Sequence, residues 1–379
     1  MAWSVNYAKV TEPGSFIRPF NRFVSSWIRD SSPGTARAAR TRLKFKMALR
    51  IAVVGCGAVA EIGHIPAACK LDKVKLVGLV DNDRTQAEKL AERFGVPKAL
   101  ASLTEVAHEI DAVVLSTPPH IRPLLAEQAF SAGLHVLCEK PLANSSAECQ
   151  AILSAAKRAN RVLAVAHTAR FFPNRVRVES LLKQKALGKV YAVDVEQGDA
   201  YDWPTRTGYT VRHDMVAGGV LLNEGIHSLD TLLWWFGSPL DFEYEDDALG
   251  GIESNVRMKL GFADGTSGRV RLSRTCRLEN RITLQGEAGN LSVPLYDQSE
   301  ITITRNGRQR SEALAVTNWD FVEVVSKQLQ DFAQSIEAEK PPRATGEDGL
   351  AVVEFIEKCY AAKRRRPLPK QAPIPGLTW

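Results

Sequence analysis

A glycine-rich turn between an apolar run and a helical stretch restricts the fold more than any other feature of this sequence. The run Leu49–Gly55 is short and apolar, as a strand buried on both faces of a parallel sheet is, and the turn follows it at once. Gly55 permits the tight turn, Gly57 lets the backbone approach a pyrophosphate, and Ala60 still allows close helix packing. The helix start offers unpaired N–H groups to phosphates. The predicted dinucleotide-binding residues are Gly55, Gly57, Ala58, Val59 and Ala60.

Strand and helix patterns continue to alternate up to about residue 170. The predicted strands are Val74–Val80, Ala112–Ser116, His135–Cys138 and Val162–Val165, and the predicted helices are Thr85–Phe94, Ile121–Ala132 and Ser145–Ala159. This βαβαβ order requires a parallel sheet joined by right-handed crossovers. We therefore predict a dinucleotide-binding Rossmann domain over residues 47–170.

After Phe171 the pattern changes to strands with short, Gly- and Asn-containing connections. The predicted strands are Lys189–Glu196, Asp241–Glu245, Asn255–Phe262, Thr266–Ser273, Asn280–Gln285 and Ser299–Arg305. Two amphipathic helices, about Phe321–Ala338 and Asp348–Arg364, are expected to cover a sheet face or return to the first domain. The predicted fold class is α/β. It comprises an N-terminal Rossmann doubly wound parallel sheet and, over residues 171–365, an α+β domain with an open, mostly antiparallel sheet. Residues 366–379 form a tail.

The first 46 residues are an extension that carries most of the charge. They hold nine Lys/Arg against two acidic residues, so the rest of the chain, within a total of +6, is nearly neutral. We expect no nucleic-acid binding from that balance. Phe20, Phe23 and Trp27 lie at helical spacing, which fits an arm that packs on a subunit, with organelle targeting or a membrane-surface helix as open alternatives.

The cysteines and the apolar runs exclude several other classes. None of the six cysteines belongs to a CxxC pair, and no His/Asp/Glu cluster has metal-ligand spacing, so we expect reduced thiols and no metal. The longest apolar runs, such as Leu232–Phe236, are far shorter than a membrane helix. We expect a cytoplasmic protein without an integral membrane segment.

A carboxylate follows the second predicted strand. Asp81 lies 24 residues beyond Gly57, where it would accept hydrogen bonds from the adenosine ribose hydroxyls. Because it would repel a 2′-phosphate, NAD is favoured, although Arg84 leaves NADP open. The alternative is that the segment Asp81-Asn-Asp83 merely caps the next helix.

Two further motifs carry residues suited to proton transfer. Glu139-Lys140-Pro141 follows the strand His135–Cys138, at the sheet edge where ligands bind, and a lysine there can polarise a substrate oxygen. Asn223 and His227 are four residues apart, hence on one helix face, and a neutral imidazole suits removal of a hydroxyl proton. The alternatives are a surface lysine and a packed core histidine.

Taken together, the motifs resemble one family. In order they are the glycine-rich turn, Ser116-Thr-Pro-Pro119, Glu139-Lys-Pro141, Arg170-Phe-Phe-Pro173 and the Gly218-Gly…Asn223…Gly-Ile-His227…Asp230 segment. The chain is similar, over about residues 48–365, to the Gfo/Idh/MocA oxidoreductases. The resemblance implies a nicotinamide cofactor between two domains, sugar, polyol or nucleotide-sugar substrates, and a homodimer or homotetramer formed through the second sheet.

The resemblance also assigns roles to individual positions. Lys140 and His227 match the catalytic lysine and histidine, and the residues that match positions beside the cofactor are Thr117, Pro118, His120 and Glu139. Asn223 departs from members that have aspartate there, and is similar to members acting on nucleotide-linked sugars. It would orient the substrate without carrying a proton.

The polar and aromatic segment before Gly218 is expected to line the substrate side. Trp203 would stack on a sugar ring, and Arg170 and Arg212 would pair with a phosphate or carboxylate. An open alternative is that these arginines make subunit contacts.

The sequence therefore predicts an NAD(P)-dependent oxidoreductase that transfers hydride between nicotinamide and a sugar-type hydroxyl or carbonyl. Two alternatives remain, namely an NAD-dependent glycosidase of the same family and a regulator that binds a dinucleotide without turnover. Retention of both Lys140 and His227 argues against the regulator.

Overall fold

The computed structural model describes residues 48–201, 208–248, 251–314 and 320–365. The predicted N-terminal extension, Trp203 and the tail 366–379 lie outside these residues. The first sheet has six parallel strands in the order β3-β2-β1-β4-β5-β6. Their bounds are β1 Leu49–Val54, β2 Val74–Val80, β3 Ala99–Leu100, β4 Ala112–Leu115, β5 His135–Cys138 and β6 Leu163–Val165. The Rossmann-type sheet is confirmed, with β3 as the strand that the sequence did not predict.

Two helices of this domain begin at residues whose side chains cap them. They are α1 Ile65–Lys70, α2 Arg84–Phe94, α3 Arg122–Ser131 and α4 Ser146–Ala159, with a π-helical turn, η1 Ala60–His64, before α1. The side chain of Asp83 caps α2 by accepting from Gln86 N, and Ser145 caps α4 in a capping box with Glu148. Short 3₁₀ turns follow at η2 Leu103–Glu105, η3 Ala107–Glu109, η4 Pro119–Ile121 and η5 Thr168–Phe171.

The strand order reverses at β1, which has β2 on one side and β4 on the other. The crevice outside the carboxyl ends of β1 and β4 is where open α/β sheets bind ligands. The turns after β1, β4 and β5 all open at this edge, so it brings together three motifs that are far apart in the sequence.

The second sheet has nine strands in the order β14-β13-β12-β11-β7-β10-β9-β8-β15. Their bounds are β7 Val190–Gly198, β8 Asp241–Asp246, β9 Asn255–Gly261, β10 Ser267–Ser273, β11 Arg281–Gly286, β12 Gly289–Pro294, β13 Glu300–Arg305, β14 Arg308–Ala313 and β15 Arg364–Arg365. Neighbours are antiparallel except for the pairs β7–β10 and β8–β15. The predicted mostly antiparallel sheet, and with it the fold class, is confirmed.

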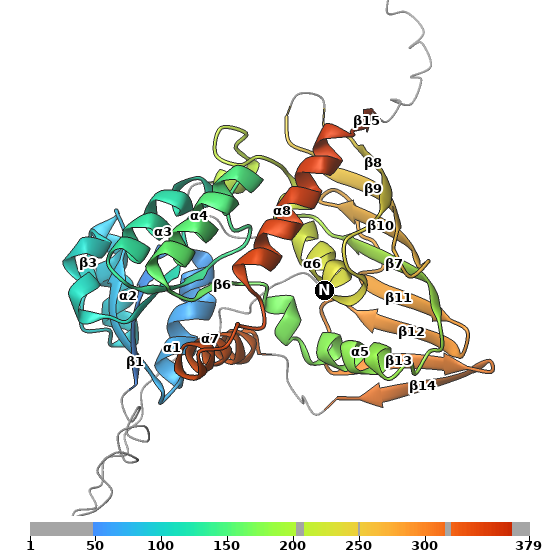
Figure 1. The fold of residues 1–379 in the computed structure, drawn as a ribbon, viewed down its shortest axis with the longest axis horizontal. Coiled ribbons are helices and arrows are strands. Elements are labelled where there is room, and N and C mark those ends of the chain that lie inside the picture. The colour runs from blue at the N-terminus through green and yellow to red at the C-terminus, as the bar shows by residue number, and fades with distance from the viewer. Residues whose placement is uncertain (1–47, 202–207, 249–250, 315–319, 366–379) are drawn as a thin grey trace, which may run out of the picture. The chain divides into compact units, whose positions relative to one another are not determined.

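One face of this sheet is covered by helices. Figure 1 shows α5 (Pro173–Lys183), α6 (Ile226–Phe236) and α8 (Gly346–Ala361) along the same side of the strands. Strands such as β9 alternate buried and exposed residues, and their buried side chains join Leu229, Val352 and Ile356 in one core. The other face carries charged residues of β9 and β10, and no described helix packs on it.

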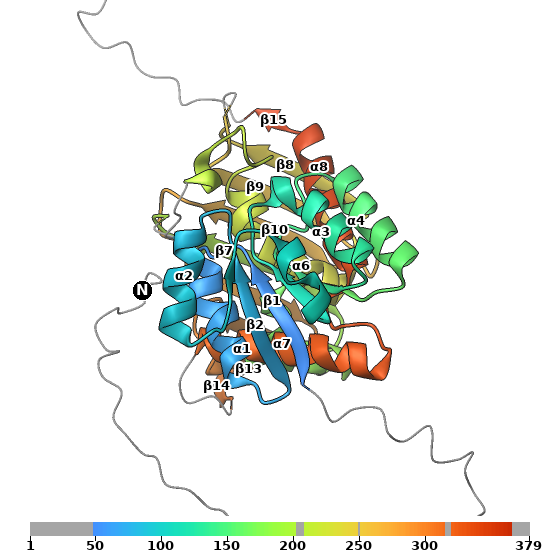
Figure 2. The ribbon, with the colours of Figure 1, turned by 90° about the vertical axis from the view of Figure 1, so that its left-hand side faces the viewer.

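The helix α7 (Phe321–Ala338) belongs to the first domain although it follows the second sheet in the chain. Figure 2 shows it beside α1, and its buried side chains Leu329 and Phe332 pack in the core of the first sheet with Ile51 and Leu79. α8 lies between the domains, in contact with α4 and α6. None of the described helices is long and apolar enough to span a membrane.

Candidate active site

The two glycines of the first turn are required for different reasons. Gly55 has a φ of +92°, and a Cβ there would lie 2.5 Å from the carbonyl oxygen of Ser116 and 2.9 Å from Thr117 Cγ2. Gly55 therefore serves the fold itself. A Cβ on Gly57 would meet nothing within 4 Å, so this glycine leaves open space beside the helix start. Ala60 is fully buried against the sheet.

Asp81 connects the end of β2 to the glycine-rich turn. Its Oδ2 accepts a hydrogen bond of 2.7 Å from Cys56 N, and its Oδ1 accepts one of 2.9 Å from Asp83 N. Gln86 Nε2 adds a bond of 3.1 Å to the carbonyl oxygen of Cys56. Within the segment Asp81-Asn-Asp83, it is Asp83 that caps α2, while the carboxylate of Asp81 binds the glycine-rich turn. Asp81 is partly exposed, and each carboxylate oxygen can accept one more bond.

Several polar atoms are buried without a hydrogen-bond partner among the described residues at this edge. Ser116 Oγ and Thr117 Oγ1 follow β4, and His64 Nδ1 and Asn144 Oδ1 also lack partners. Such atoms are rare in native proteins and call for a ligand or water. Together with the open space at Gly57, they fit a bound dinucleotide. Of the other two residues predicted beside the cofactor, Pro118 is partly buried and His120 is exposed.

Glu139 links the residues around β5. Its Oε1 makes a 2.8 Å hydrogen bond with Nε2 of His64, and its Oε2 accepts one of 3.0 Å from the backbone N of Lys140. Both side chains of the His64–Glu139 pair are buried. Burial alone would raise the pKa of Glu139, but the hydrogen bond to His64 and the charges of His64, Lys140 and Arg122 outweigh it and lower that pKa. No sequence pattern marks His64 as a site residue.

Arg122, also missed by the sequence analysis, holds the two loops of the site together. Its Nε donates to the carbonyl oxygen of Thr117 at 2.9 Å, and its Nη1 donates to the carbonyl oxygens of Glu139, at 2.6 Å, and Pro141. The peptide bond between Lys140 and Pro141 is cis. A buried guanidinium with several carbonyl partners fixes the loops after β4 and β5 relative to each other.

Lys140 joins the first domain to the turn that leads into α6. Its Nζ donates a 2.9 Å hydrogen bond to the backbone carbonyl oxygen of Asn223. Burial lowers the pKa of Lys140, while the negative charges of Glu139 and Glu224 act in the opposite direction. The contact brings Lys140 to the helix that carries His227.

The start of that helix explains the paired glycines of its motif. A Cβ on Gly218 would lie 2.0 Å from the hydroxyl of Tyr360, and one on Gly219 would lie 1.9 Å from the carbonyl oxygen of Glu253. Glu253 in turn accepts hydrogen bonds from Gly219 N (2.7 Å), Leu221 N (2.9 Å) and Tyr360 Oη (2.9 Å). This buried carboxylate anchors the π-helical turn η7 (Leu221–Gly225) that leads into α6.

His227 lies one turn further along the same helix. It is partly exposed, and its ring makes no hydrogen bond to any described residue. Burial, followed by the positive charge of Lys140, lowers its pKa well below the ordinary 6.5, so the ring is neutral near pH 7. His167 lies at the end of β6 and is fully buried, with Nδ1 3.8 Å from Asp230 Oδ1. A positive charge on His167 would lower the pKa of His227 further.

Of the five residues predicted to bind substrate, Arg170 and Arg212 are held in ion pairs with carboxylates. Arg170 is buried, and its guanidinium is paired with Asp230 at 2.8 Å and Asp348 at 3.0 Å, so both carboxylates already occupy the charge that was predicted to bind substrate. Arg212 is exposed and pairs with Asp214. Trp203 is outside the described residues. These two ion pairs of Arg170 connect η5 to α6 and α8.

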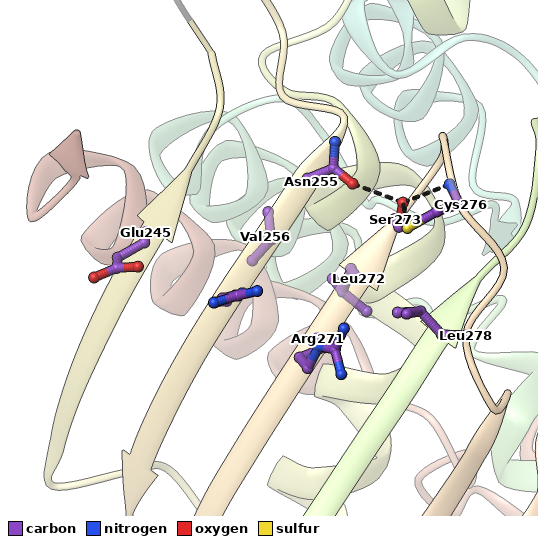
Figure 3. Close-up of a pocket in the computed structure, with 9 residues that line it drawn as sticks. Glu245, Asn255, Val256, Arg271, Leu272, Ser273, Cys276 and Leu278 are labelled. Carbon is purple, nitrogen blue, oxygen red and sulfur yellow. Dashed lines mark hydrogen bonds between the residues drawn. The ribbon is translucent and has the colours of Figure 1, made fainter. Parts of the chain in front are cut away.

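A separate cavity of about 190 Å³ lies on the second sheet, at the ends of β8, β9 and β10 (Figure 3). Ser273 is one of its lining residues, donating to Asn255 Oδ1 at 2.6 Å and accepting from Cys276 N at 2.9 Å. It is lined by Arg257 and Arg271 but by none of the predicted site residues, so it is not part of the candidate active site.

Two profiles of one family match the chain. The first is described as an oxidoreductase family, NAD-binding Rossmann fold, and covers residues 49–167. The second, described as the C-terminal alpha/beta domain of that oxidoreductase family, covers residues 179–369.

Individual relatives are distant but span most of the chain. The myo-inositol 2-dehydrogenase of Thermotoga maritima is 23% identical over 83% of this chain and 96% of its own. The aldose-aldose oxidoreductase of Caulobacter crescentus has a similar structure, with a TM-score of 0.76, 24% identity and coverage of 83% of this chain and 97% of its own. The UDP-N-acetylglucosamine 3-dehydrogenase of Acidithiobacillus ferrooxidans has a TM-score of 0.72 and 23% identity, and covers 84% of this chain and 98% of its own.

Proposed function

The chain belongs to the Gfo/Idh/MocA oxidoreductase family, and from this premise we propose that it transfers hydride between a nicotinamide dinucleotide and a carbon of a sugar, polyol or nucleotide sugar. The observation that carries the proposal is the 2.9 Å hydrogen bond from Lys140 Nζ to the Asn223 carbonyl oxygen, which joins the two motifs suited to proton transfer. The names of relatives that act on inositol and on UDP-N-acetylglucosamine support this substrate class.

The dinucleotide is proposed to lie along the carboxyl edge of the first sheet. The N–H groups and open space at Gly57 would hold the pyrophosphate, and Asp81 would accept hydrogen bonds from the ribose hydroxyls. The unpartnered hydroxyls of Ser116 and Thr117 would contact the end that carries the nicotinamide. Because Asp81 is a carboxylate, NAD is the favoured cofactor, with NADP as the second candidate.

The bound nicotinamide supplies a hydride acceptor or donor, and the protein supplies proton handling and alignment. In the oxidative direction, neutral His227 removes the proton of the substrate hydroxyl. Lys140 donates a hydrogen bond to the same oxygen and stabilises the negative charge that develops on it. Asn223, one turn before His227, orients the substrate. In the reductive direction His227 returns the proton.

The proposal is tested by combining binding with turnover. Native mass spectrometry of the purified protein should detect one dinucleotide per subunit, either retained through purification or bound on addition of NAD. Oxidation of myo-inositol, D-xylose or UDP-N-acetylglucosamine should then produce NADH, measured by its absorbance. A chain that binds neither NAD nor NADP would refute the proposal. Sugar release from an aryl glycoside without net NADH would favour the glycosidase alternative.

We further propose that two or more copies associate through the uncovered face of the second sheet. A cross-strand row on this face reads acid, base, base, acid over β8, β9, β10 and β7, in Glu243, Lys259, Arg269 and Asp194. Lys259 pairs with Glu243 at 3.1 Å, and Arg269 pairs with Asp194 at 2.6 Å. Covering this face would leave Lys259 and Arg269 with partners, because each already has an anion beside it.

A further inference from the structure

Glu224 carries a carboxylate directly beside Asn223, and it has no role in the mechanism above. Its side chain is 25% exposed, and that of its partner Arg274, at the end of β10, is 7% exposed. Arg274 donates to it twice, from Nε to Oε2 at 2.9 Å and from Nη2 to Oε1 at 3.2 Å. Asn223 Nδ2 donates to the same Oε1 at 3.1 Å. The carboxylate therefore receives three hydrogen bonds, one of them from a residue of the proposed active site.

Asn223 has a second partner on the same nitrogen. Nδ2 also donates to the hydroxyl of Tyr201 at 3.1 Å, and that hydroxyl donates to Thr210 Oγ1 at 3.0 Å. The guanidinium of Arg274 lies over the Tyr201 ring, 4.5 Å from its centroid, and its Nη1 reaches the carbonyl oxygen of Thr210. The five residues form one closed network around the side-chain amide of Asn223.

The chemistry of these partners fixes the orientation of the amide. An ionised carboxylate only accepts hydrogen bonds, so the atom of Asn223 that faces Glu224 must be the NH₂ group. Both N–H bonds of that group are then used, by Glu224 and Tyr201. The side-chain Oδ1 accepts no hydrogen bond from the described residues. The network therefore holds Nδ2 of Asn223, and the side-chain Oδ1 can accept a hydrogen bond from a ligand.

Charge also couples Glu224 to the proposed chemistry. The negative charge of Glu224 raises the pKa of Lys140, against the larger effect of burial. Burial in turn raises the pKa of Glu224 itself, and the hydrogen bonds from Arg274 and the charge of Lys140 oppose that rise. The carboxylate therefore lies within electrostatic reach of the residue that polarises the substrate oxygen.

We propose that Glu224, held by Arg274, is a positioning residue that turns the carbonyl oxygen of Asn223 toward the substrate, so that the site selects a substrate with a hydroxyl or N–H donor beside the reacting carbon. This inference rests on the proposed function. A neutral acceptor accepts a hydrogen bond from such a donor and disfavours a carboxylate or phosphate at the same place.

Glu224→Gln replaces one acceptor oxygen of the carboxylate by an NH₂ donor and keeps the length of the side chain. Arg274 would bind the carbonyl oxygen of the new glutamine, whose NH₂ group would then face the NH₂ group of Asn223. The Asn223 amide would turn over in response and present a donor to the substrate. We expect KM for the sugar to rise about 10- to 100-fold, as for a lost buried hydrogen bond, with dinucleotide affinity nearly unchanged and a smaller change in kcat, because Lys140 loses a nearby negative charge. Glu347→Gln, an exposed glutamate of α8, is the matched control.

The double variant Asn223→Asp/Glu224→Gln transfers the carboxylate from position 224 to position 223. The new aspartate can accept from the new glutamine and still offer an oxygen to the substrate, whereas Asn223→Asp alone places two carboxylates against each other. We expect both single variants to raise KM and the double variant to recover most of the loss, a coupling that a double-mutant cycle measures. Independent, additive effects of the two changes would overturn the proposal, as would a Glu224→Gln enzyme that melts earlier but keeps the wild-type KM.

The same cycle, measured by urea unfolding, separates failure of the proposal from failure of the proposed function. Non-additive unfolding midpoints are expected from the network alone, and additive midpoints would remove the assignment of the Asn223 amide. A wild-type chain that binds NAD but turns over none of myo-inositol, D-xylose and UDP-N-acetylglucosamine would overturn the proposed function, and the substrate selection by Asn223 with it.

Discussion

Lys140 is surrounded by positively and negatively charged groups, and burial has the largest effect on its pKa. Its pKa is lowered although Glu139 and Glu224 both act to raise it. The hydrogen bond to the Asn223 carbonyl oxygen holds the ammonium group without neutralising it. A charged group held in this way can stabilise a developing oxyanion with little rearrangement.

Replacing this ammonium group tests the mechanism at a single residue. Lys140→Met keeps the length of the side chain and removes the charge and the donor. Turnover should fall about 10²- to 10⁴-fold, the range for a lost acid–base group, while NAD affinity measured by fluorescence titration stays close to wild type. Lys157→Met, on the exposed side of α4, controls for the loss of a charge. Near-normal turnover in Lys140→Met would exclude Lys140 from the chemistry.

The pH dependence of oxidation follows from the two shifted groups. His227 must be neutral, and its pKa lies well below 6.5, so kcat/KM should stay on its plateau below that pH and fall only as pH drops through the lowered value. Lys140 must be charged, and its pKa lies below 10.5, so activity should fall on the alkaline side earlier than for a free lysine. A pH series of kcat/KM measures both limbs. An acid limb centred at or above 6.5 would contradict the assignment of His227.

At the scale of secondary-structure elements, Gly219 before α6 is tightly packed, whereas Gly57 in the turn after β1 has open space beside it. Gly219→Ala places a methyl group 1.9 Å from the Glu253 carbonyl oxygen and should lower the melting temperature by several degrees. Gly57→Ala meets no protein atom within 4 Å and should melt normally. It should still weaken NAD binding, because the methyl group occupies the space proposed for the pyrophosphate. Calorimetry of both variants with and without NAD checks this, and equal NAD affinity in Gly57→Ala would argue against that placement.

Elements with a buried-face pattern were predictable from the sequence, and elements without one were not. The strands of the first sheet are short apolar runs because both of their faces are buried, and α7 was predicted at its observed bounds from its single apolar face. β14, Arg308–Ala313, is an edge strand of polar residues paired only with β13, so no apolar alternation marks it. β12 contains Gly289 and Pro294, which read as turn residues.

The candidate site was predictable only where its residues belong to local motifs. Lys140, Asn223 and His227 stand in such motifs. Other contacts of the site join residues that are far apart in the chain, and no local motif marks them. They are the hydrogen bonds between His64 and Glu139, from Arg122 to the loops after β4 and β5, and from Arg274 to Glu224. Arg170 was assigned to substrate because an arginine gives the same sequence signal in a binding site and in a buried ion-pair cluster.

At the scale of the whole molecule, the uncovered face of the second sheet predicts how copies associate. Lys259→Glu/Arg269→Glu would align four acidic side chains across β8, β9, β10 and β7, with Glu243 and Asp194 at the ends. The assembly should dissociate to a smaller mass in light scattering. The fold should persist, because exposed ion pairs contribute only about 0–1 kcal/mol each.

Lys73→Glu, before β2 in the first domain, is the control for a charge reversal remote from this face. An unchanged mass in the double variant would place the subunit interface elsewhere. A chain that is already a monomer before any change would remove the association proposal altogether.

The position of α7 has a consequence for synthesis on the ribosome. The first sheet is translated early, yet Leu329 and Phe332, which complete its core, emerge only after the whole second sheet has been made. At about 5–20 residues per second, the unfinished core waits for many seconds with apolar surface uncovered. Nascent chains arrested before Phe321 should therefore be bound by chaperones and cut readily by protease, and protection should begin once α7 has left the exit tunnel.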